Sequence, residues 1–445
     1  MRIPKRPPDR EKLHRDLLEQ PKRLLAVIEA STVAGQGEKY MHWDRLKYYK
    51  RPDDLSLEEW WLAIKLARTR TTKSIPLVDT KSNHFTFGTP DPVPEHLHHI
   101  DQDAAGRIEM AQEQITNPAT RDRYIYDSLV EESITSSQLE GASTTRRVAK
   151  EMLRTRRRPR DHSEIMIRNN YLAMQRVREL KDKPLTKAIL LELHTILTTG
   201  TLDDPSASGR FRLPDESVKV YDNYNEILHT PPKAGELPKR LAAMLDFANG
   251  KTPRYFIHPV VRSIILHFWL AYDHPFVDGN GRCARTLFYW SMLRQGYWLC
   301  EFLSISQIIR KAPVKYGTAF LYTESDENDL TYFILYHLDM IRRSIRELHE
   351  HISKNTKAMR QTQTMMRASE SLNHRQLALL THALRHPEAG YSLRSHSVSH
   401  NVTHQTARTD LYTLVKRGLL TQRTIGRTFY FYPAEDLERR IRELQ

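Results

Sequence analysis

Apolar residues recur three and four positions apart over most of the chain, with polar residues between them. This spacing puts the apolar side chains on one face of a helix and is typical of amphipathic or buried helices. Ser56 is a predicted N-cap, and Gly141 and Gly200 are predicted helix ends. The predicted helices cover residues 55–70, 123–141, 162–180, 184–200, 236–250, 257–276, 281–295 and 329–354.

Two segments depart from the helical spacing and alternate instead. Residues 74–90 carry turn residues between alternating positions, which predicts a short hairpin. Residues 208–232 alternate around Val218 and Val220 and end in a double proline. The second segment is predicted as a β-hairpin or an extended flap, and the fold class is therefore mainly α with a small β-hairpin flap.

The pattern divides the chain into four parts. Residues 1–100 form a helical N-terminal extension with a short hairpin, and residues 101–354 form the helical core. Residues 355–372 are polar and are predicted to be a linker. Residues 373–445 are predicted as three helices followed by a hairpin, which makes a small separate domain.

Composition narrows the function classes. The chain has 445 residues, 39% hydrophobic and 27% charged, with a formal net charge of +14. These values exclude gross disorder, and the charge favours an anionic partner such as nucleic acid or a nucleotide, although it also aids solubility. The two cysteines, Cys283 and Cys300, are too few for a disulfide framework, so a reducing cytoplasm is expected. The basic N-terminus is no secretory signal, and the most apolar run, residues 263–272, is too short to cross a bilayer.

The segment "HPFVDGNGRCAR", residues 274–285, concentrates groups suited to phosphate chemistry. Glycines at the start of a helix expose backbone N–H groups to an anion. Arg282 and Arg285 share one helix face and can both bind phosphate oxygens. Asp278 is a suitable Mg²⁺ ligand, and His274 can take a proton from an attacking hydroxyl. Together these residues indicate a phosphoryl-transfer site.

Two common nucleotide motifs do not account for this segment. No Gly-Lys-Ser/Thr follows the glycines, so the segment is not a P-loop. No predicted strand precedes it, so it is not a dinucleotide-binding fingerprint. The site must therefore be interpreted from its own residues.

The segment resembles the signature of the Fic family, His-x-Phe-x-Asp/Glu-Gly-Asn-Gly-Arg-x-x-Arg, at every defined position. The resemblance extends from roughly residue 40 to residue 345. It implies a mostly helical fold that uses ATP and Mg²⁺ and transfers AMP to a protein hydroxyl, with release of pyrophosphate. Some relatives transfer phosphate, UMP or phosphocholine instead. Those that transfer phosphate tend to depart from the motif at its glycines, so the intact glycines favour AMP.

The resemblance also implies a role for each residue of the motif. His274 would be the general base and Asp278 the Mg²⁺ ligand, while Phe276 would anchor the loop in the core. Arg282 would hold the β- and γ-phosphates and Arg285 the γ-phosphate. The anion hole would be formed by Gly279, Asn280 and Gly281. A target backbone would align by strand addition along the flap residues Val218, Lys219, Val220 and Tyr221.

The segment "SSQLEG", residues 136–141, places Ser136 and Glu140 one helical turn apart. One interpretation is a surface glutamate before a helix end. The segment also resembles the family's inhibitory motif, Ser/Thr-x-x-x-Glu-Gly/Asn, which Gly141 completes. On that interpretation Glu140 pairs with Arg285 and occupies the guanidinium group that should hold the γ-phosphate.

The C-terminal domain resembles a winged helix-turn-helix. Thr403 is a good N-cap for a helix whose first turns expose polar residues, and a basic hairpin follows. Residues 373–432 contain eight Lys or Arg against two Asp or Glu. DNA binding is one interpretation, and protein contact or dimerisation is another. The candidate DNA contacts are Gln405, Thr406, Arg408, Thr409, Arg423 and Arg427.

Two functions are consistent with these features. The first is a protein adenylyltransferase of the Fic type, inhibited by Glu140, that modifies a Tyr, Thr or Ser of a target protein or of itself. The alternative is a DNA-binding transcriptional regulator whose Fic core acts as a nucleotide sensor or self-modifier. The intact His274 favours the enzyme, because a sensor has no need of a base. The family often pairs, which suggests a homodimer, and no membrane contact is expected.

Overall fold

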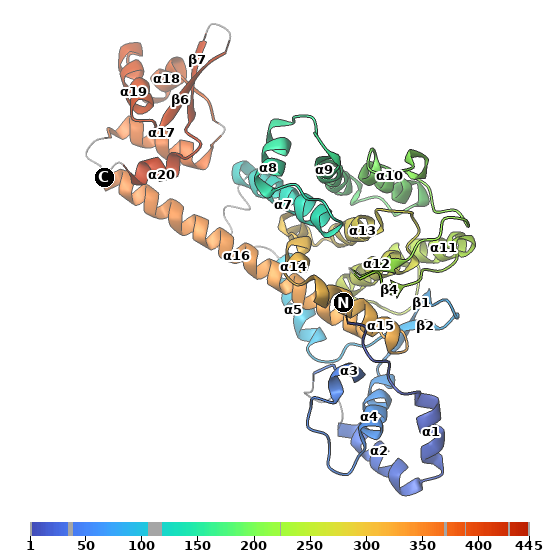
Figure 1. The fold of residues 1–445 in the computed structure, drawn as a ribbon. Coiled ribbons are helices and arrows are strands. Elements are labelled where there is room, and N and C mark those ends of the chain that lie inside the picture. Colours follow the sequence, from blue (N-terminus) through green and yellow to red (C-terminus); the bar gives the residue numbers. More distant parts are fainter. Residues whose placement is uncertain are drawn as a thin grey trace. The chain divides into compact units, whose positions relative to one another are not determined.

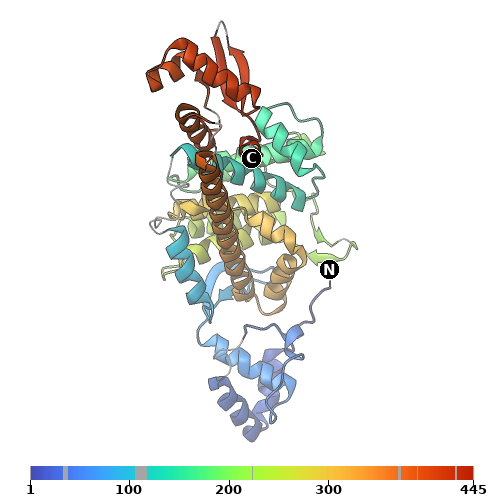
Figure 2. The ribbon, with the colours of Figure 1, turned by 90° about the vertical axis from the view of Figure 1, so that its left-hand side faces the viewer.

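The structure is a computed structural model that describes residues 2–33, 39–105, 118–222, 224–368, 372–387, 389–425 and 428–443. It is mainly helical, as the apolar spacing predicts (Figure 1, Figure 2). The chain forms two compact units. The core unit comprises Met1–Arg107 and Asp127–Ile345, and the C-terminal unit comprises Ile108–Tyr126 and Arg346–Gln445. None of the helices described is long and apolar enough to cross a membrane.

The N-terminal part of the core unit is a small helical cluster. Its helices are α1 (Arg10–Leu18), α2 (Pro21–Val33), α3 (Trp43–Leu46) and α4 (Leu57–Thr69). Ser56 caps α4 in a capping box with Glu59, as its position predicts. The "WW" pair of this helix, Trp60 and Trp61, lies in the buried cluster that holds these helices together.

Two antiparallel hairpins flank the helices of the core unit. Strands β1 (Lys73–Val78) and β2 (His84–Phe87) form the first, where the sequence predicts it. Strands β3 (Val220–Tyr221) and β4 (Ile227–His229) form the second, inside the predicted flap. Helix α5 (Val93–Ala104) follows the first hairpin.

Helices α12 (Pro259–Asp273) and α13 (Asn280–Arg294) form the centre of the core unit and pack against each other (Figure 1). Nearly all their side chains are buried, which is expected of helices that are covered on every side. The surrounding helices are α7 (Pro118–Leu139), α8 (Arg146–Thr155), α9 (His162–Leu180), α10 (Lys187–Thr198), α11 (Leu237–Ala248), α14 (Ile305–Lys311), α15 (Pro313–Ser325) and α16 (Thr331–Ala368). Short 3₁₀ turns cover Pro205–Ala207, Ala234–Glu236 and Trp298–Phe302.

Helix α16 is longer than its apolar pattern predicts. It runs to Ala368, so most of the polar segment 355–372 is helical. Residues 355–368 contain no Gly or Pro and are rich in Lys, Arg, Gln, Met and Ala, which all have high helix propensity. A polar segment of this composition continues a helix without contributing to a core.

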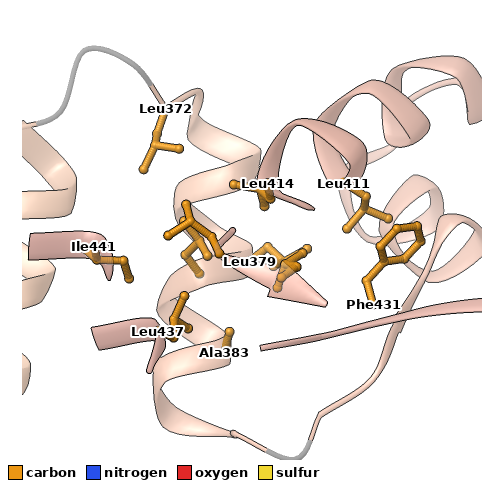
Figure 3. Close-up of a cluster of buried hydrophobic side chains, with 11 residues drawn as sticks. Leu372, Leu379, Ala383, Leu411, Leu414, Phe431, Leu437 and Ile441 are labelled. Atoms are coloured by element: carbon orange, nitrogen blue, oxygen red, sulfur yellow. The ribbon is translucent and has the colours of Figure 1, made fainter. Parts of the chain in front are cut away.

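The C-terminal unit places helices on a three-stranded sheet of order β5-β7-β6. Its elements are α17 (His374–Arg385), β5 (Tyr391–Ser392), α18 (Leu393–His400), α19 (His404–Lys416), β6 (Leu420–Ile425), β7 (Thr428–Pro433) and α20 (Leu437–Arg442). Leu379, Leu411, Leu414 and Phe431 point into its apolar core (Figure 3). Strand β5 is absent from the sequence prediction, because two residues are too short for a visible alternation.

A buried carboxylate joins three parts of this unit. Asp410 on α19 accepts hydrogen bonds from Asn373 at 2.8 Å and from Arg375 at 2.7 Å, and His396 lies 3.2 Å away. Burial acts to raise the pKa of Asp410, but the hydrogen bonds of Arg375, Asn373 and His396 outweigh it and lower the pKa. The unit is therefore tied together by a charge as well as by its apolar core.

We expect Asp410→Ala to destabilise the C-terminal unit by about 2–4 kcal/mol, because Arg375 and His396 lose a buried partner. Hydrogen exchange of the α17–β7 amides measures this destabilisation.

The lowered pKa of Asp410 means that the parent keeps this stabilisation above the ordinary carboxylate pKa and loses it as pH falls through the lowered pKa. Asp436→Ala is the matched control: its carboxylate lies at the surface and pairs with Arg439 and Arg440, so a much smaller destabilisation is expected. Equal destabilisation in both variants would contradict this role.

Candidate active site

The loop between α12 and α13 has a fixed backbone conformation. His274 ends α12 in the left-handed region at φ 45°, and Gly279 precedes α13 at φ 81°. Asn280 closes the loop with its side chain, since its amide oxygen accepts from the Phe276 N–H at 3.0 Å and its amide nitrogen donates to the Phe276 carbonyl at 2.9 Å. The Asn280 side chain therefore shapes the loop.

The His274 ring has a defined tautomer. Its Nδ1 lies 3.2 Å from the Ala271 carbonyl, which can only accept, so Nδ1 carries the hydrogen and Nε2 keeps its lone pair. Burial lowers the pKa of His274 to about 4. The imidazole is therefore neutral at physiological pH, which is the state that a general base requires.

Two residues outside the motif hold this loop. His194 on α10 donates from Nε2 to the Asp278 carbonyl at 3.0 Å, accepts the Gly209 N–H at Nδ1 at 3.0 Å, and stacks on Phe276 with ring centroids 3.7 Å apart. Arg212 donates to the His274 carbonyl at 2.9 Å and also to the Pro232 carbonyl. Neither residue is among the sequence-based candidates. In the sequence, His194 stands out only as a histidine in the apolar run "LLELHTIL", and Arg212 only as the second arginine of "SGRFR".

The start of α13 is built to receive an anion. The first N–H groups of a helix have no carbonyl partner within it. The Arg282 side chain is fully buried there, with Nη1 donating to the Leu197 carbonyl at 3.1 Å, and its Nε has no hydrogen-bond partner in the described part of the chain. A Cβ at Gly279 would meet Thr198 at 2.9 Å, so this glycine is required by contact as well as by φ. A buried cation with an unused donor beside free N–H groups fits a phosphate group.

Asp278 fits a Mg²⁺ ion that phosphates share. Its side chain is half exposed, and Oδ2 accepts from Arg282 Nη2 at 3.0 Å. Within the described ranges, no group of three or more His, Cys, Asp or Glu side chains could hold a metal without other ligands. Mg²⁺ commonly binds through one or two carboxylates together with phosphate oxygens and water, so one carboxylate at this position is sufficient.

Arg285 is held by α7. Its Nε donates to the Ser136 hydroxyl at 2.9 Å, and its Nη2 donates to the Ser136 carbonyl at 3.1 Å and to Glu140 Oε1 at 2.7 Å. The Arg285 side chain is 3% exposed and that of Glu140 is 29% exposed. Burial acts to raise the pKa of Glu140, but the charge and hydrogen bond of Arg285 outweigh it and lower the pKa, so Glu140 is ionised.

Glu140 also covers the start of α13. A Cβ built on Gly281 would lie 2.1 Å from Glu140 Oε1. The carboxylate thus occupies the space beside the glycine that the sequence assigns to anion binding, and Gly141 follows it at φ 95°. Ser136, Glu140 and Arg285 are brought together as the resemblance to the inhibitory motif implies, while the inhibitory role itself stays a prediction.

The remaining candidates lie on other elements. Val220 and Tyr221 form β3, while Val218 and Lys219 precede it as irregular chain. The hairpin is attached to α12, because His229 on β4 lies 2.7 Å from the Tyr272 carbonyl.

In the C-terminal unit, the candidate DNA contacts lie on α19 and β6. Gln405, Arg408 and Thr409 are exposed on α19, Thr406 is half-buried, and Arg423 is exposed on β6. Arg427 lies outside the described residues.

Comparison with known proteins agrees with this geometry. A family model described as "Fic/DOC family" matches residues 184–292, which include His194 and the whole motif. The chain is 37% identical over 93 residues to "Protein adenylyltransferase Fic" of Nematostella vectensis, which covers 21% of this chain and 20% of that protein. It is 31% identical over 140 residues to the protein of the same name from Drosophila willistoni, covering 31% and 25%. The chain thus spans about a quarter or less of the length of these relatives.

The fold is also found in a solved structure. A Fic family protein from Desulfovibrio desulfuricans G20 superposes with a TM-score of 0.52 at 20% sequence identity, covering 78% of this chain and 98% of that chain. At this identity the similarity concerns the fold alone. The chain therefore has a mainly helical Fic fold, with the predicted site at its centre.

We expect His274 to titrate with a midpoint near pH 4 instead of near its ordinary value, because burial disfavours the imidazolium. NMR of histidine-labelled protein measures this, and His274→Asn identifies the signal. A His274 midpoint of about 6 or above would contradict the buried, neutral base.

Proposed function

We propose that the chain is a protein adenylyltransferase that moves AMP from ATP to a hydroxyl side chain of a target protein or of itself. The observation that carries this proposal is the free Nε2 lone pair of His274 beside the anion-binding start of α13. A base next to a phosphate site is the minimum that phosphoryl transfer requires. The relatives named protein adenylyltransferase support the choice of reaction.

Each residue of the site has its own role in the proposed reaction. His274 Nε2 accepts the proton of the attacking hydroxyl, whose oxygen forms a bond to the α-phosphorus of ATP. The bond from that phosphorus to the bridging oxygen breaks, and pyrophosphate leaves. Arg282 and the N–H groups of α13 bind the negative charge of the phosphates. A Mg²⁺ held by Asp278 would neutralise further phosphate charge.

The pair of Arg285 and Glu140 is an autoinhibitory contact in this proposal. Ser136 and Glu140 use three N–H donors of Arg285, and Glu140 already compensates its charge, so a γ-phosphate must compete with Glu140 for this guanidinium. Glu140 also repels phosphate at the start of α13 by charge. A charge-assisted pair of this kind contributes about 1.5–3 kcal/mol, which corresponds to roughly one to two decades in activity.

The flap is proposed as the docking edge for the target. Strand β3 pairs with β4 on one edge, and no other described strand pairs with β3. An exposed strand edge can align an extended peptide through main-chain hydrogen bonds. Tyr221 and Ile227 are both exposed and offer apolar contact to such a peptide.

We expect the parent protein, incubated with Mg²⁺ and ATP labelled on the α-phosphate, to acquire label slowly. Glu140→Gly should acquire it about 10 to 100 times faster, because Arg285 becomes free for the γ-phosphate. Intact-mass spectra report the adduct. Label on the γ-phosphate should leave with pyrophosphate and give no labelled protein.

His274→Ala in the Glu140→Gly background is the control for the chemistry, and it should remove label incorporation while the protein keeps its fold, as its thermal melt would show. Retention of γ-label in place of α-label would show phosphate transfer and refute AMP transfer. A Glu140→Gly protein no faster than the parent would refute the inhibitory contact.

DNA binding by the C-terminal unit is the second candidate, and its surface charge favours it. Between residues 373 and 432, Asp410 is the one acidic residue at a described position, and it is buried beneath Arg375. Arg394, Arg408 and Arg423 are exposed. The order of helices and strands supports the winged-helix interpretation, in which α19 would be the recognition helix.

We expect the protein to bind duplex DNA with an affinity that falls steeply with salt, through counterion release. Replacing Arg408 and Arg423 by Ala should reduce the slope of log K against log salt by about 0.9 for each phosphate that is no longer neutralised. Fluorescence anisotropy measures this. Arg439→Ala with Arg442→Ala removes the same charge from α20, where both arginines are ion-paired, and should leave the slope unchanged. Salt-independent or absent binding would favour protein contact instead.

A further inference from the structure

Helix α7 and the residue directly after it carry three polar side chains that point toward the core from one face. Glu132, Ser136 and Glu140 follow one another at intervals of four residues. Ser136 and Glu140 contact Arg285. Glu132 does not hydrogen-bond to Arg285, although its charge acts on that guanidinium, and it has partners of its own that the proposed reaction does not use.

Glu132 is a buried carboxylate, 2% exposed. It accepts hydrogen bonds from the Ser306 N–H at 3.1 Å, the Ser306 hydroxyl at 2.5 Å and the Ser304 hydroxyl at 2.9 Å. These three bonds attach α7 to the beginning of α14. A buried carboxylate is costly unless hydrogen bonds satisfy it, so this geometry is strongly preferred over any displaced position of α7.

Helix α13 holds the same segment. The Tyr289 hydroxyl donates to the Leu303 carbonyl at 3.1 Å and accepts the Ile305 N–H at 2.9 Å. Tyr289 lies one helical turn after Arg285. Residues 303–306 are therefore attached to α7 through Glu132 and to α13 through Tyr289, while Arg285 joins the two helices directly.

We propose that Glu132 is a positioning residue for the autoinhibitory contact: it fixes α7 so that Glu140 reaches Arg285. The inference rests on the proposed function, because it requires Glu140 to inhibit. Helix α7 ends at Leu139, so Glu140 lies at a helix end and is partly exposed. Helix ends open readily, and the Glu132 attachment lies about 12 Å back along the axis, at eight residues of about 1.5 Å each.

We expect Glu132→Gln to raise the rate of automodification about threefold to tenfold, between the rates of the parent and Glu140→Gly. The amide keeps the shape of the carboxylate but weakens its three hydrogen bonds, so Glu140 leaves Arg285 more often. Ser306→Ala removes one donor from the other side and should act in the same direction. The assay is α-label incorporation from ATP into the full chain, with a thermal melt of each variant.

Two comparisons distinguish a positioning role of Glu132 from a general destabilisation of α7. Glu131→Gln is the matched control, because Glu131 is the adjacent residue of α7 and pairs with Arg146 and Lys150 of α8 instead of α14. It should leave the rate at the parent level. In the Glu140→Gly background, Glu132→Gln and Ser306→Ala should give no further rise, because the residue on which they act is absent.

The outcomes distinguish this inference from the proposed function. If Glu140→Gly is faster than the parent but Glu132→Gln and Ser306→Ala are not, the positioning role is wrong and the inhibition by Glu140 stands. The positioning role would also be wrong if Glu131→Gln raised the automodification rate as much as Glu132→Gln does. It would be wrong too if Glu132→Gln or Ser306→Ala raised the rate further in the Glu140→Gly background. If Glu140→Gly is itself no faster, the inhibitory contact fails first.

Discussion

The structure depends on how the buried charge of Arg285 is compensated. Its side chain is 3% exposed, and a buried guanidinium without an anion is strongly destabilising. Glu140 and Ser136 provide that compensation within the chain. In the proposed reaction a γ-phosphate provides it instead. In the proposed function, inhibition and stability would therefore depend on the same ion pair, because Glu140 and the γ-phosphate would compete for one cation.

The other residues of the site are already held in place, so few of them would have to move when a γ-phosphate replaces Glu140 at Arg285. Asn280 closes the loop, His194 and Arg212 hold its backbone, and His274 is kept neutral with its lone pair free. Groups fixed before the reaction act without reorganisation energy. The part left to change is the end of α7 with Glu140.

Much of this site could be predicted because its parts are close in sequence. The motif spans residues 274–285 and resembles a family signature, and helical periodicity places Ser136 and Glu140 on one face because they are one turn apart. His194, Arg212 and Glu132 could not be found in this way. Their partners lie 84, 62 and 174 positions away, and only tertiary packing brings them together. A histidine or glutamate in an apolar helix gives no indication of which distant carbonyl or hydroxyl it will meet.

The magnitude of the contact decides how complete the inhibition can be. A charge-assisted pair contributes about 1.5–3 kcal/mol, and Glu140 is 29% exposed, which favours the lower part of that range. A ligand at about a hundred times its dissociation constant supplies about 2.7 kcal/mol by mass action. The two free energies are similar, so under the proposed function abundant ATP would compete effectively with Glu140 for Arg285. In the proposed function Glu140 would therefore reduce the population of the productive state without abolishing it, and the attachment of α7 at Glu132 would set how large that reduction is.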